Sequence, residues 1–150
     1  MIYWDTSAAV KLYVEELDSP VWHRILVESP GPHVTSALLE AELAFALRGK
    51  EQRGDLRRGG ATALLQQFRR DVARGRFTLF PLGADVILRA TRLADEVSLP
   101  PGEPGLRTLD GLHLATAVLL RCEALVTADR RMQAGAARLG LPLRGRPASH

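Results

Sequence analysis

The chain has 150 residues, of which 46% are hydrophobic and 25% charged, and Cys122 is its only cysteine. This composition excludes a disordered or fibrous protein, and the length predicts one globular domain over residues 1–150. One cysteine excludes an internal disulfide, and the lack of a long apolar run argues against a membrane span or a signal peptide. We therefore expect a cytoplasmic protein without a membrane partner.

The positive charge of the chain is carried mainly by arginine. The formal net charge is +3, the isoelectric point is about 9.6, and only Lys11 and Lys50 are lysine among the 20 basic residues. Guanidinium groups match phosphate oxygens through paired hydrogen bonds, which favours nucleic-acid binding. The coding bias of a G+C-rich genome would give the same excess, and the sequence does not decide between the two.

The predicted elements alternate between strands and helices. The first is a buried strand at Ile2–Trp4, and helix-forming residues follow Asp5 at once. The later patterns predict, in order, a helix capped by Asp18 or Ser19, a strand at 33–35, a helix from a Ser36 cap to about Gly54, a helix at 62–75, a strand at 76–82, a helix at 84–97, a loop at 98–106, a buried helix at 109–120, a strand at 124–129, a helix to Leu139 and a short edge strand at 141–143. Because parallel strands need crossover connections, this order predicts a three-layer α/β/α sandwich with a central, mainly parallel sheet of four to five strands.

Two acids, Asp5 and Asp129, lie at or just past the ends of predicted strands. Ligands of open α/β sheets bind outside the carboxyl ends of the strands, so this is where a site is expected. Asp110 belongs to a helix that is apolar nearly all round, and we expect its side chain to be buried there. An unpaired buried carboxylate costs several kcal/mol, so such acids need a compensating partner.

A fourth acid, Glu42, is predicted to lie on the apolar face of its helix. Helical spacing puts Leu39 three residues before it and Phe45 three residues after it. Glu40, two positions earlier, lies nearer the polar edge, where we expect it to be solvated.

The four acids allow two interpretations. Taken separately, Asp5 and Asp110 would be helix N-caps, Asp129 would cap the last helix, and Glu42 would pair with an arginine. Taken together, they would hold a divalent cation, which reverses the repulsion between neighbouring carboxylates. Mg²⁺ or Mn²⁺ fits an all-oxygen ligand set best, and we expect His113 to pack nearby or support the site rather than bind metal.

Four segments resemble, in order and approximate spacing, the PIN-domain ribonucleases, in particular the VapC-type toxins of bacterial toxin–antitoxin pairs. The segments are "IYWDTSAAVKLYVEE", "TSALLEAELAFALRG", "LRTLDGLHLATA" and "LVTADRRM". They span nearly the whole chain, and their order makes the resemblance fairly specific although each is short. Gly111 departs from the family, which more often has a larger residue such as Ala at this position.

The resemblance implies a metal-dependent endoribonuclease toxin. The acids that would hold one or two Mg²⁺ or Mn²⁺ ions are Asp5, Glu42, Asp110 and Asp129, and the hydroxyl residues that would orient them or a water are Thr6 and Thr127. A water activated by the metal would attack an RNA phosphodiester, with Asp110 or Glu42 as the proton acceptor. The resemblance also implies a VapB-type antitoxin as partner, inhibiting through an arginine in the acidic pocket, and a homodimer.

Three arginines, Arg107, Arg130 and Arg131, are placed to contact RNA phosphates, although each fits a solvated surface position as well. One alternative function is a PIN-like binding module that no longer cleaves RNA. A Mg²⁺-dependent phosphoryl-transfer domain is disfavoured, because "DTS" lacks a second Asp and no lysine follows Lys50. The sequence indicates no particular RNA target.

Overall fold

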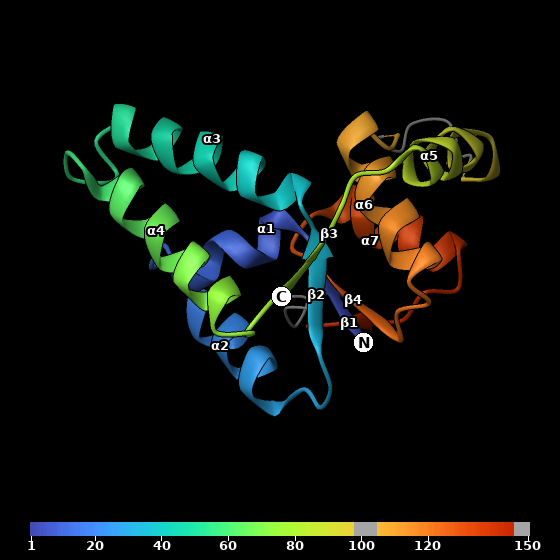
Figure 1. The fold of residues 1–150 in the computed structure, drawn as a ribbon, viewed down its shortest axis with the longest axis horizontal. Coiled ribbons are helices and arrows are strands. Elements are labelled where there is room, and N and C mark those ends of the chain that lie inside the picture. Colours follow the sequence, from blue (N-terminus) through green and yellow to red (C-terminus); the bar gives the residue numbers. More distant parts are fainter. Residues whose placement is uncertain (98–104, 146–150) are drawn as a thin grey trace.

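The fold is built on a parallel β-sheet. The computed structural model describes residues 1–97 and 105–145. Its strands are β1 (Ile2–Trp4), β2 (His33–Ser36), β3 (Thr78–Phe80), β4 (Ala124–Val126) and β5 (Leu143–Arg144). They lie in the order β3-β2-β1-β4-β5, and every neighbouring pair is parallel (Figure 1). The predicted parallel sheet of four to five strands is confirmed.

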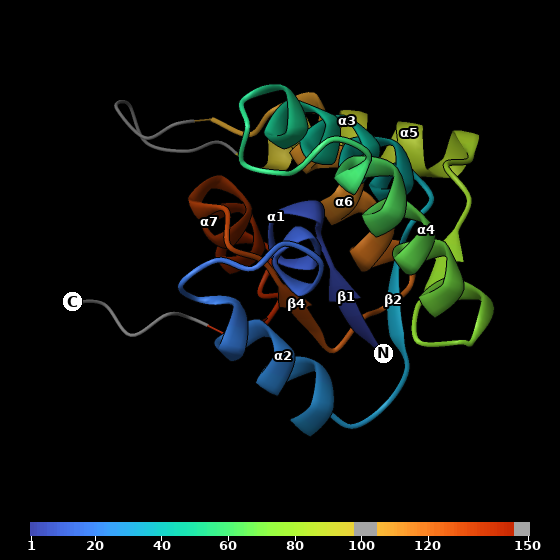
Figure 2. The same ribbon diagram turned by 90° about the vertical axis from the view of Figure 1, so that its left-hand side faces the viewer.

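Helices cover both faces of this sheet. They are α1 (Thr6–Ala9), the 3₁₀ helix η1 (Val10–Leu12), α2 (Ser19–Glu28), α3 (Leu38–Gln52), α4 (Gly60–Ala73), α5 (Ala84–Glu96), α6 (Thr108–Leu119) and α7 (Arg130–Arg138). Seen along the sheet, α1 to α4 lie on one side and α5 to α7 on the other, and the turned view shows α1 beside β1 and β4 (Figures 1 and 2). The α/β/α sandwich is therefore confirmed. No helix in the described ranges is both long and apolar enough to cross a membrane.

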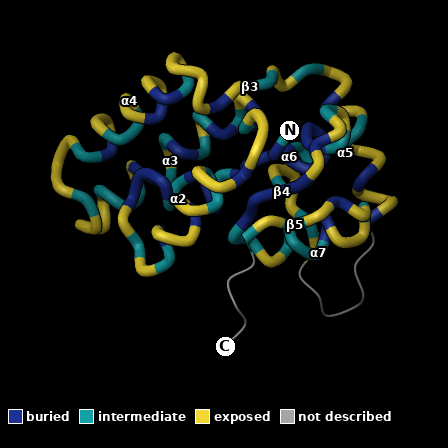
Figure 3. Tube along the Cα trace, turned by 90° about the horizontal axis from the view of Figure 1, so that it is seen from below, coloured by how far each residue is buried: buried dark blue, intermediate teal, exposed yellow. Residues whose placement is uncertain are grey.

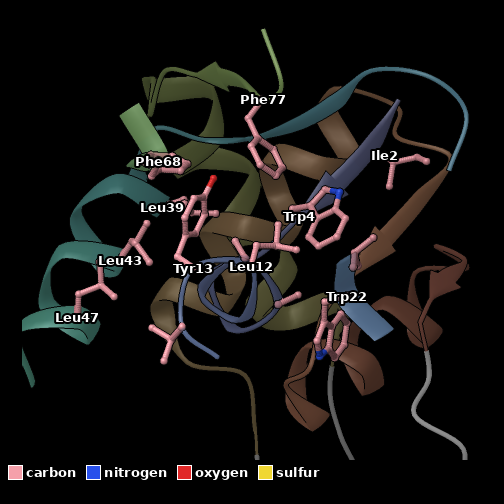
Figure 4. Packing of buried hydrophobic residues seen from close by; sticks show 14 of the residues in the cluster. Ile2, Trp4, Leu12, Tyr13, Trp22, Leu39, Leu43, Leu47, Phe68 and Phe77 are labelled. Atoms are coloured by element: carbon pink, nitrogen blue, oxygen red, sulfur yellow. The ribbon is translucent and has the colours of Figure 1, made fainter. Parts of the chain in front are cut away.

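Strand β1 supplies side chains to two separate cores. Ile2 and Trp4 belong to the cluster under α1 to α4, whereas Tyr3 belongs to the cluster under α5 to α7, as expected from the alternation of side chains along a strand. In the first cluster Trp4 packs edge to face against Phe77, with ring centroids 5.9 Å apart (Figure 4). Buried positions are concentrated toward the sheet, and exposed ones on the outer sides of the helices (Figure 3).

Some local predictions need correction. Ser36 does not cap a helix: it is the last residue of β2, paired with Phe80 of β3, and α3 begins at Leu38. The hydroxyl of Ser36 still accepts a hydrogen bond from the amide of Leu38 at 3.2 Å, which explains why the sequence signal resembled a cap. The edge strand begins at Leu143 rather than Leu141. Most of the predicted loop at 98–106 lies outside the described residues.

The apolar face of α3 also differs from the prediction. Leu39, Leu43 and Leu47 are fully buried, whereas Phe45 is 83% exposed, so the buried stripe is narrower than the sequence pattern indicated. Glu42 lies at the border of this stripe and is half-buried. Glu40 is also half-buried and forms an ion pair with Arg69 at 2.6 Å, so it is not simply solvated.

Candidate active site

The candidate site lies where the strand order changes direction. The chain places β2 and β3 on one side of β1 and β4 and β5 on the other, so the carboxyl ends of β1 and β4 meet at a topological switch point. In this pair Trp4 lies opposite Val126. Asp5 follows Trp4 directly, and Asp129 comes three residues after Val126. The parallel register thus brings two acids, distant in sequence, to one edge of the sheet.

A pocket of about 420 Å³ opens at this edge, and all four predicted acids line it. We call it the acid pocket; its lining residues are Asp5, Thr6, Ser7, Glu42, Arg107, Thr108, Leu109, Asp110, His113 and Asp129. A larger pocket, of about 740 Å³, lies at η1 and the start of α2 and contains none of the four acids. The convergence of the acids, not the size of the hollow, marks the acid pocket as the candidate site.

Asp5 is the most buried of the four acids, with 4% of its surface exposed. It is the N-cap of α1 and accepts a hydrogen bond from the amide of Ala8 at 3.1 Å. The hydroxyls of Ser7 and Thr127 each donate to its carboxylate at 2.8 Å. Burial raises the pKa of Asp5 above its usual range despite these donors. Asp5 is therefore both a helix cap and an acid whose charge is only partly compensated.

Glu42 lies on the opposite wall of the acid pocket and is held through one oxygen. Its Oε2 accepts hydrogen bonds from the hydroxyl of Thr6 and from Nε2 of His113, both at 2.6 Å. Burial alone would raise the pKa of Glu42, but the hydrogen bonds from His113 and Thr6 outweigh it and leave that pKa below its usual range. Glu42 is accordingly kept as an anion.

The other two acids occupy helix starts. Asp129 is the N-cap of α7 and accepts hydrogen bonds from the amides of Arg131 and Met132 at 2.6 and 3.3 Å. Asp110 lies in the first turn of α6, where its Oδ2 accepts from the amide of Arg107 at 2.8 Å. The expectation that Asp110 is buried is wrong: it is half-exposed, because the helix turns its first residues toward the pocket and buries only the turns that follow.

The hydroxyl residues and arginines differ in how closely they approach the acids. Thr6 contacts Glu42 and the buried Thr127 contacts Asp5. Of the three arginines considered for phosphate contact, only Arg107 lines the acid pocket. Arg130 and Arg131 begin α7 next to Asp129, with Arg130 exposed and Arg131 half-buried.

Two contributors were missed in the sequence, Ser7 and Tyr3. The hydroxyl of Ser7 bridges Asp5 and the amide of Ala128, so it joins the start of α1 to the segment that follows β4. The phenol of Tyr3 lies 2.7 Å from Nδ1 of His113. The sequence did offer one signal for Tyr3: a Tyr hydroxyl in a buried strand normally needs a hydrogen-bond partner.

The donors of the acid pocket are of the kind that Mg²⁺ or Mn²⁺ prefers, namely carboxylate oxygens at a partly open position. Within the described ranges no Lys or Arg side chain forms an ion pair with any of the four acids. Across the same ranges no three His, Cys, Asp or Glu side chains are already arranged as a metal-ligand set. The fit is thus one of donor chemistry and location, and binding would require the acids to turn toward one another.

Comparison with known proteins gives the family to which a chain with this fold and this pocket belongs. Residues 2–138 match the model of the PIN domain family, and the chain therefore belongs to the PIN-domain family.

Two relatives from Mycobacterium tuberculosis indicate the group within this family to which the chain belongs. Ribonuclease VapC46 is 36% identical over 143 residues, which cover 93% of each chain. Ribonuclease VapC35 is 33% identical over 146 residues, covering 94% of this chain and 93% of the relative. Within the PIN-domain family the chain belongs with the VapC proteins.

Solved structures agree on the fold. VapC20 of M. tuberculosis, described as a toxin that cleaves the sarcin–ricin loop, superposes with a TM-score of 0.65 at 16% identity, covering 89% of this chain and 94% of that one. A chain of a toxin–antitoxin complex from Klebsiella pneumoniae gives a TM-score of 0.64 at 20% identity, covering 92% and 94%. A chain of the VapBC2 complex from Rickettsia felis, bound to promoter DNA, gives 0.63 at 18% identity, covering 96% and 98%.

Proposed function

We propose that this protein is a Mg²⁺- or Mn²⁺-dependent endoribonuclease that acts as the toxin of a toxin–antitoxin pair. The observation that carries the proposal is that four acids from four separate segments line one pocket at the switch point of the sheet. The names of the VapC relatives support RNA as the substrate class. The particular RNA is a matter of loop shape and RNA fold rather than of these acids.

The metal ligands in this proposal are Asp5, Glu42, Asp110 and Asp129. A bound divalent ion would neutralise charge on the scissile phosphate and lower the pKa of a water molecule. The residues of the chain hold the acids for this purpose: Thr127 and Ser7 fix the orientation of Asp5, and the backbone fixes Asp110 and Asp129 at their helix starts. Either Asp110 or Glu42 accepts the proton of the attacking water.

Arg107 is the arginine that we propose to contact RNA phosphate first, because it lines the pocket next to Asp110. Arg130 and Arg131, at the start of α7, would extend this contact along the strand. Phosphate contacts of this kind supply affinity that falls with salt but no sequence preference. Loss of one arginine should therefore weaken binding of all RNAs alike.

A nuclease assay tests the proposal. Purified protein is incubated with a labelled RNA in 5–10 mM Mg²⁺ or Mn²⁺ (about the range in which weak metal sites fill), or with a chelator. Cleavage should require the metal and should fall by at least about 100-fold in Asp5→Asn and Asp129→Asn, since each removes a charged ligand. The matched control is Asp55→Asn, an exposed acid paired only with Arg53. Equal cleavage by all of these proteins would contradict the proposal, because the acids would then not be needed. Absence of cleavage by the wild type, with RNA still bound, would favour a binding module that does not cut RNA.

The partner and the assembly form the second part of the proposal. Solved toxin–antitoxin complexes among the structural neighbours support a VapB-type antitoxin as partner. We propose a homodimer from the resemblance to the VapC-type toxins alone. Expression of the chain alone should arrest bacterial growth, and co-expression of a small protein encoded immediately upstream should relieve the arrest. Light scattering of the purified chain measures the dimer. Arrest that persists in Asp5→Asn would separate toxicity from the acid pocket and contradict the proposed mechanism.

A further inference from the structure

His113 connects three elements through a continuous chain of hydrogen bonds. It lies in α6 with 3% of its surface exposed. Its Nδ1 is 2.7 Å from the hydroxyl of Tyr3 in β1, and its Nε2 is 2.6 Å from Oε2 of Glu42 in α3. The rings of Tyr3 and His113 also pack edge to face, with centroids 5.8 Å apart. Two polar rings in an apolar core are costly unless their hydrogen bonds are satisfied, so this arrangement calls for a reason beyond packing.

The partners of His113 favour one tautomer. The hydroxyl oxygen of Tyr3 accepts from the amide of Ser36 at 3.1 Å, so its own proton is free to be donated to Nδ1. Burial raises the pKa of Tyr3, which keeps that proton on the phenol. With Nδ1 as acceptor, the ring proton lies on Nε2, where it is donated to the carboxylate of Glu42.

The consequence for Glu42 is that its two oxygens differ. Oε2 receives two donors, His113 and the hydroxyl of Thr6. Among the described residues no hydrogen bond to Oε1 is present, so Oε1 is the oxygen left for a ligand in the pocket that Glu42 lines. His113 also lines the pocket, but it is almost fully enclosed and both of its nitrogens are hydrogen-bonded, so we assign it no direct contact with a substrate.

We propose that His113 is a positioning residue for Glu42, with its tautomer set by Tyr3 and Glu42 together, and that it fixes Oε2 so that Glu42 presents Oε1 to the metal or the substrate. This inference rests on the proposed nuclease function and names the device that orients one acid of that site. Residues that orient a ligating acid in this way often change metal affinity or activity about 10- to 100-fold when they are removed.

The first experiment compares two substitutions at one position. His113→Leu keeps the volume and suits the apolar neighbours of α6, but it removes the donor to Glu42. His113→Gln places an amide NH₂ close to the position of Nε2 and keeps that donor. Binding of Mn²⁺, measured from the rise in melting temperature over a Mn²⁺ titration, should weaken about 10-fold or more in His113→Leu and recover to within about 3-fold in His113→Gln.

RNA cleavage is the second property to be measured in the two His113 variants. In His113→Leu we expect kcat to fall about 10- to 100-fold while KM for RNA changes less than about 3-fold, because the arginines that hold phosphate are untouched. His33→Leu is the matched control: His33 accepts a hydrogen bond from the indole of Trp4 at 3.0 Å and does not line the acid pocket. Equal Mn²⁺ affinity and kcat in the wild type and His113→Leu, or no recovery in His113→Gln, would overturn the proposal.

The tautomer can be measured without any activity. Long-range ¹H–¹⁵N correlation spectra of the imidazole of His113 should show the proton on Nε2 in the wild type. In Tyr3→Phe, which lacks the phenolic donor, the chemical shift of Nδ1 should move because its hydrogen bond is lost. A proton on Nδ1 in the wild type, or a spectrum unaffected by Tyr3→Phe, would overturn the inference. A wild-type protein that neither cleaves RNA nor binds Mn²⁺ would instead contradict the proposed function, while the spectra would still decide how His113 is held.

Discussion

Two pockets of this protein contain acids, and they differ in whether a lysine pairs with a carboxylate that lines the pocket. The larger one, at η1 and the start of α2, includes Glu16, which pairs with Lys11 at 2.7 Å and with Lys50 at 2.9 Å. Asp18, beside it, pairs with Lys11 at 2.8 Å. In the acid pocket, by contrast, the hydrogen bonds that the carboxylate of Asp5 accepts from described residues come only from hydroxyls and a backbone amide.

The difference shows in the pKa of one acid from each pocket, since the pKa of Glu42 in the acid pocket is lowered as well, by His113 and Thr6 rather than by a lysine. The hydrogen bonds from Lys11 and Lys50 lower the pKa of Glu16, whereas burial raises the pKa of Asp5. Both lysines of the chain pair with Glu16. In the part of the chain that the structure describes, no lysine or arginine pairs with the buried Asp5, and this marks the acid pocket as a functional site better than its size does.

The largest effect that separates the pockets should be on catalysis. Asp110→Asn keeps an oxygen that can accept from the amide of Arg107, so a purely capping acid would tolerate it. If Asp110 is a ligand or a base, RNA cleavage should fall by at least about 100-fold. Asp18→Asn, the same change beside the larger pocket, should leave cleavage within about 2-fold. A steady-state nuclease assay on both variants measures this difference. Equal cleavage rates would show that the acid pocket is no more important for cleavage than the larger pocket.

The next effect concerns metal and stability. A ligand at 100 times its dissociation constant stabilises the native state by about 2.7 kcal/mol, which corresponds to a rise in melting temperature of roughly 5–10 °C for a chain of this size. We expect Mn²⁺ to give such a rise in the wild type and in Glu16→Gln but not in Asp5→Asn. Differential scanning fluorimetry with a Mn²⁺ series measures it. A rise that survives in Asp5→Asn would place the metal elsewhere.

The convergence of the acids was within reach of the sequence. A short apolar strand ending at Asp5, and another ending three residues before Asp129, imply neighbouring acids once the strands are parallel. The bridge through Ser7 and the hydrogen-bond chain from Tyr3 through His113 to Glu42 could not be predicted from the sequence, because they depend on contacts between residues many positions apart.

Exposure was the other property that the sequence pattern misjudged. Phe45 and Asp110 both belong to helices with many apolar residues, and both were expected to be buried. Which side of a helix is covered depends on its neighbours: α3 buries its leucine stripe, leaving Phe45 outside, and the first turn of α6 faces the pocket. A single helix pattern does not contain this information.

A smaller effect should appear in the stability of the metal-free protein. Asp5→Asn removes a buried charge, so it should stabilise the fold by about 1 kcal/mol or roughly 2–4 °C, as substitutions at functional sites often do. Glu16→Gln breaks partly exposed ion pairs and should destabilise by about 0.5 kcal/mol. Chelator-treated proteins are compared by urea unfolding. Destabilisation in both variants would show that Asp5 serves the fold as Glu16 does.

The smallest effect is the pH dependence of these two differences. The pKa of Asp5 is raised in the folded state, so the cost of its charge is full above the folded pKa and is absent below its unfolded pKa of about 3.9. The pKa of Glu16 is lowered, so its stabilisation is full above its unfolded pKa of about 4.3 and is lost as pH falls through the folded pKa. The gain in Asp5→Asn and the loss in Glu16→Gln should therefore both be largest near pH 7 and shrink toward acid. Unfolding curves at about pH 7, 5, 4 and 3 test both differences, because the loss in Glu16→Gln shrinks only below the unfolded pKa of Glu16. A gain in Asp5→Asn that grew in acid would reverse the sign assigned to its burial.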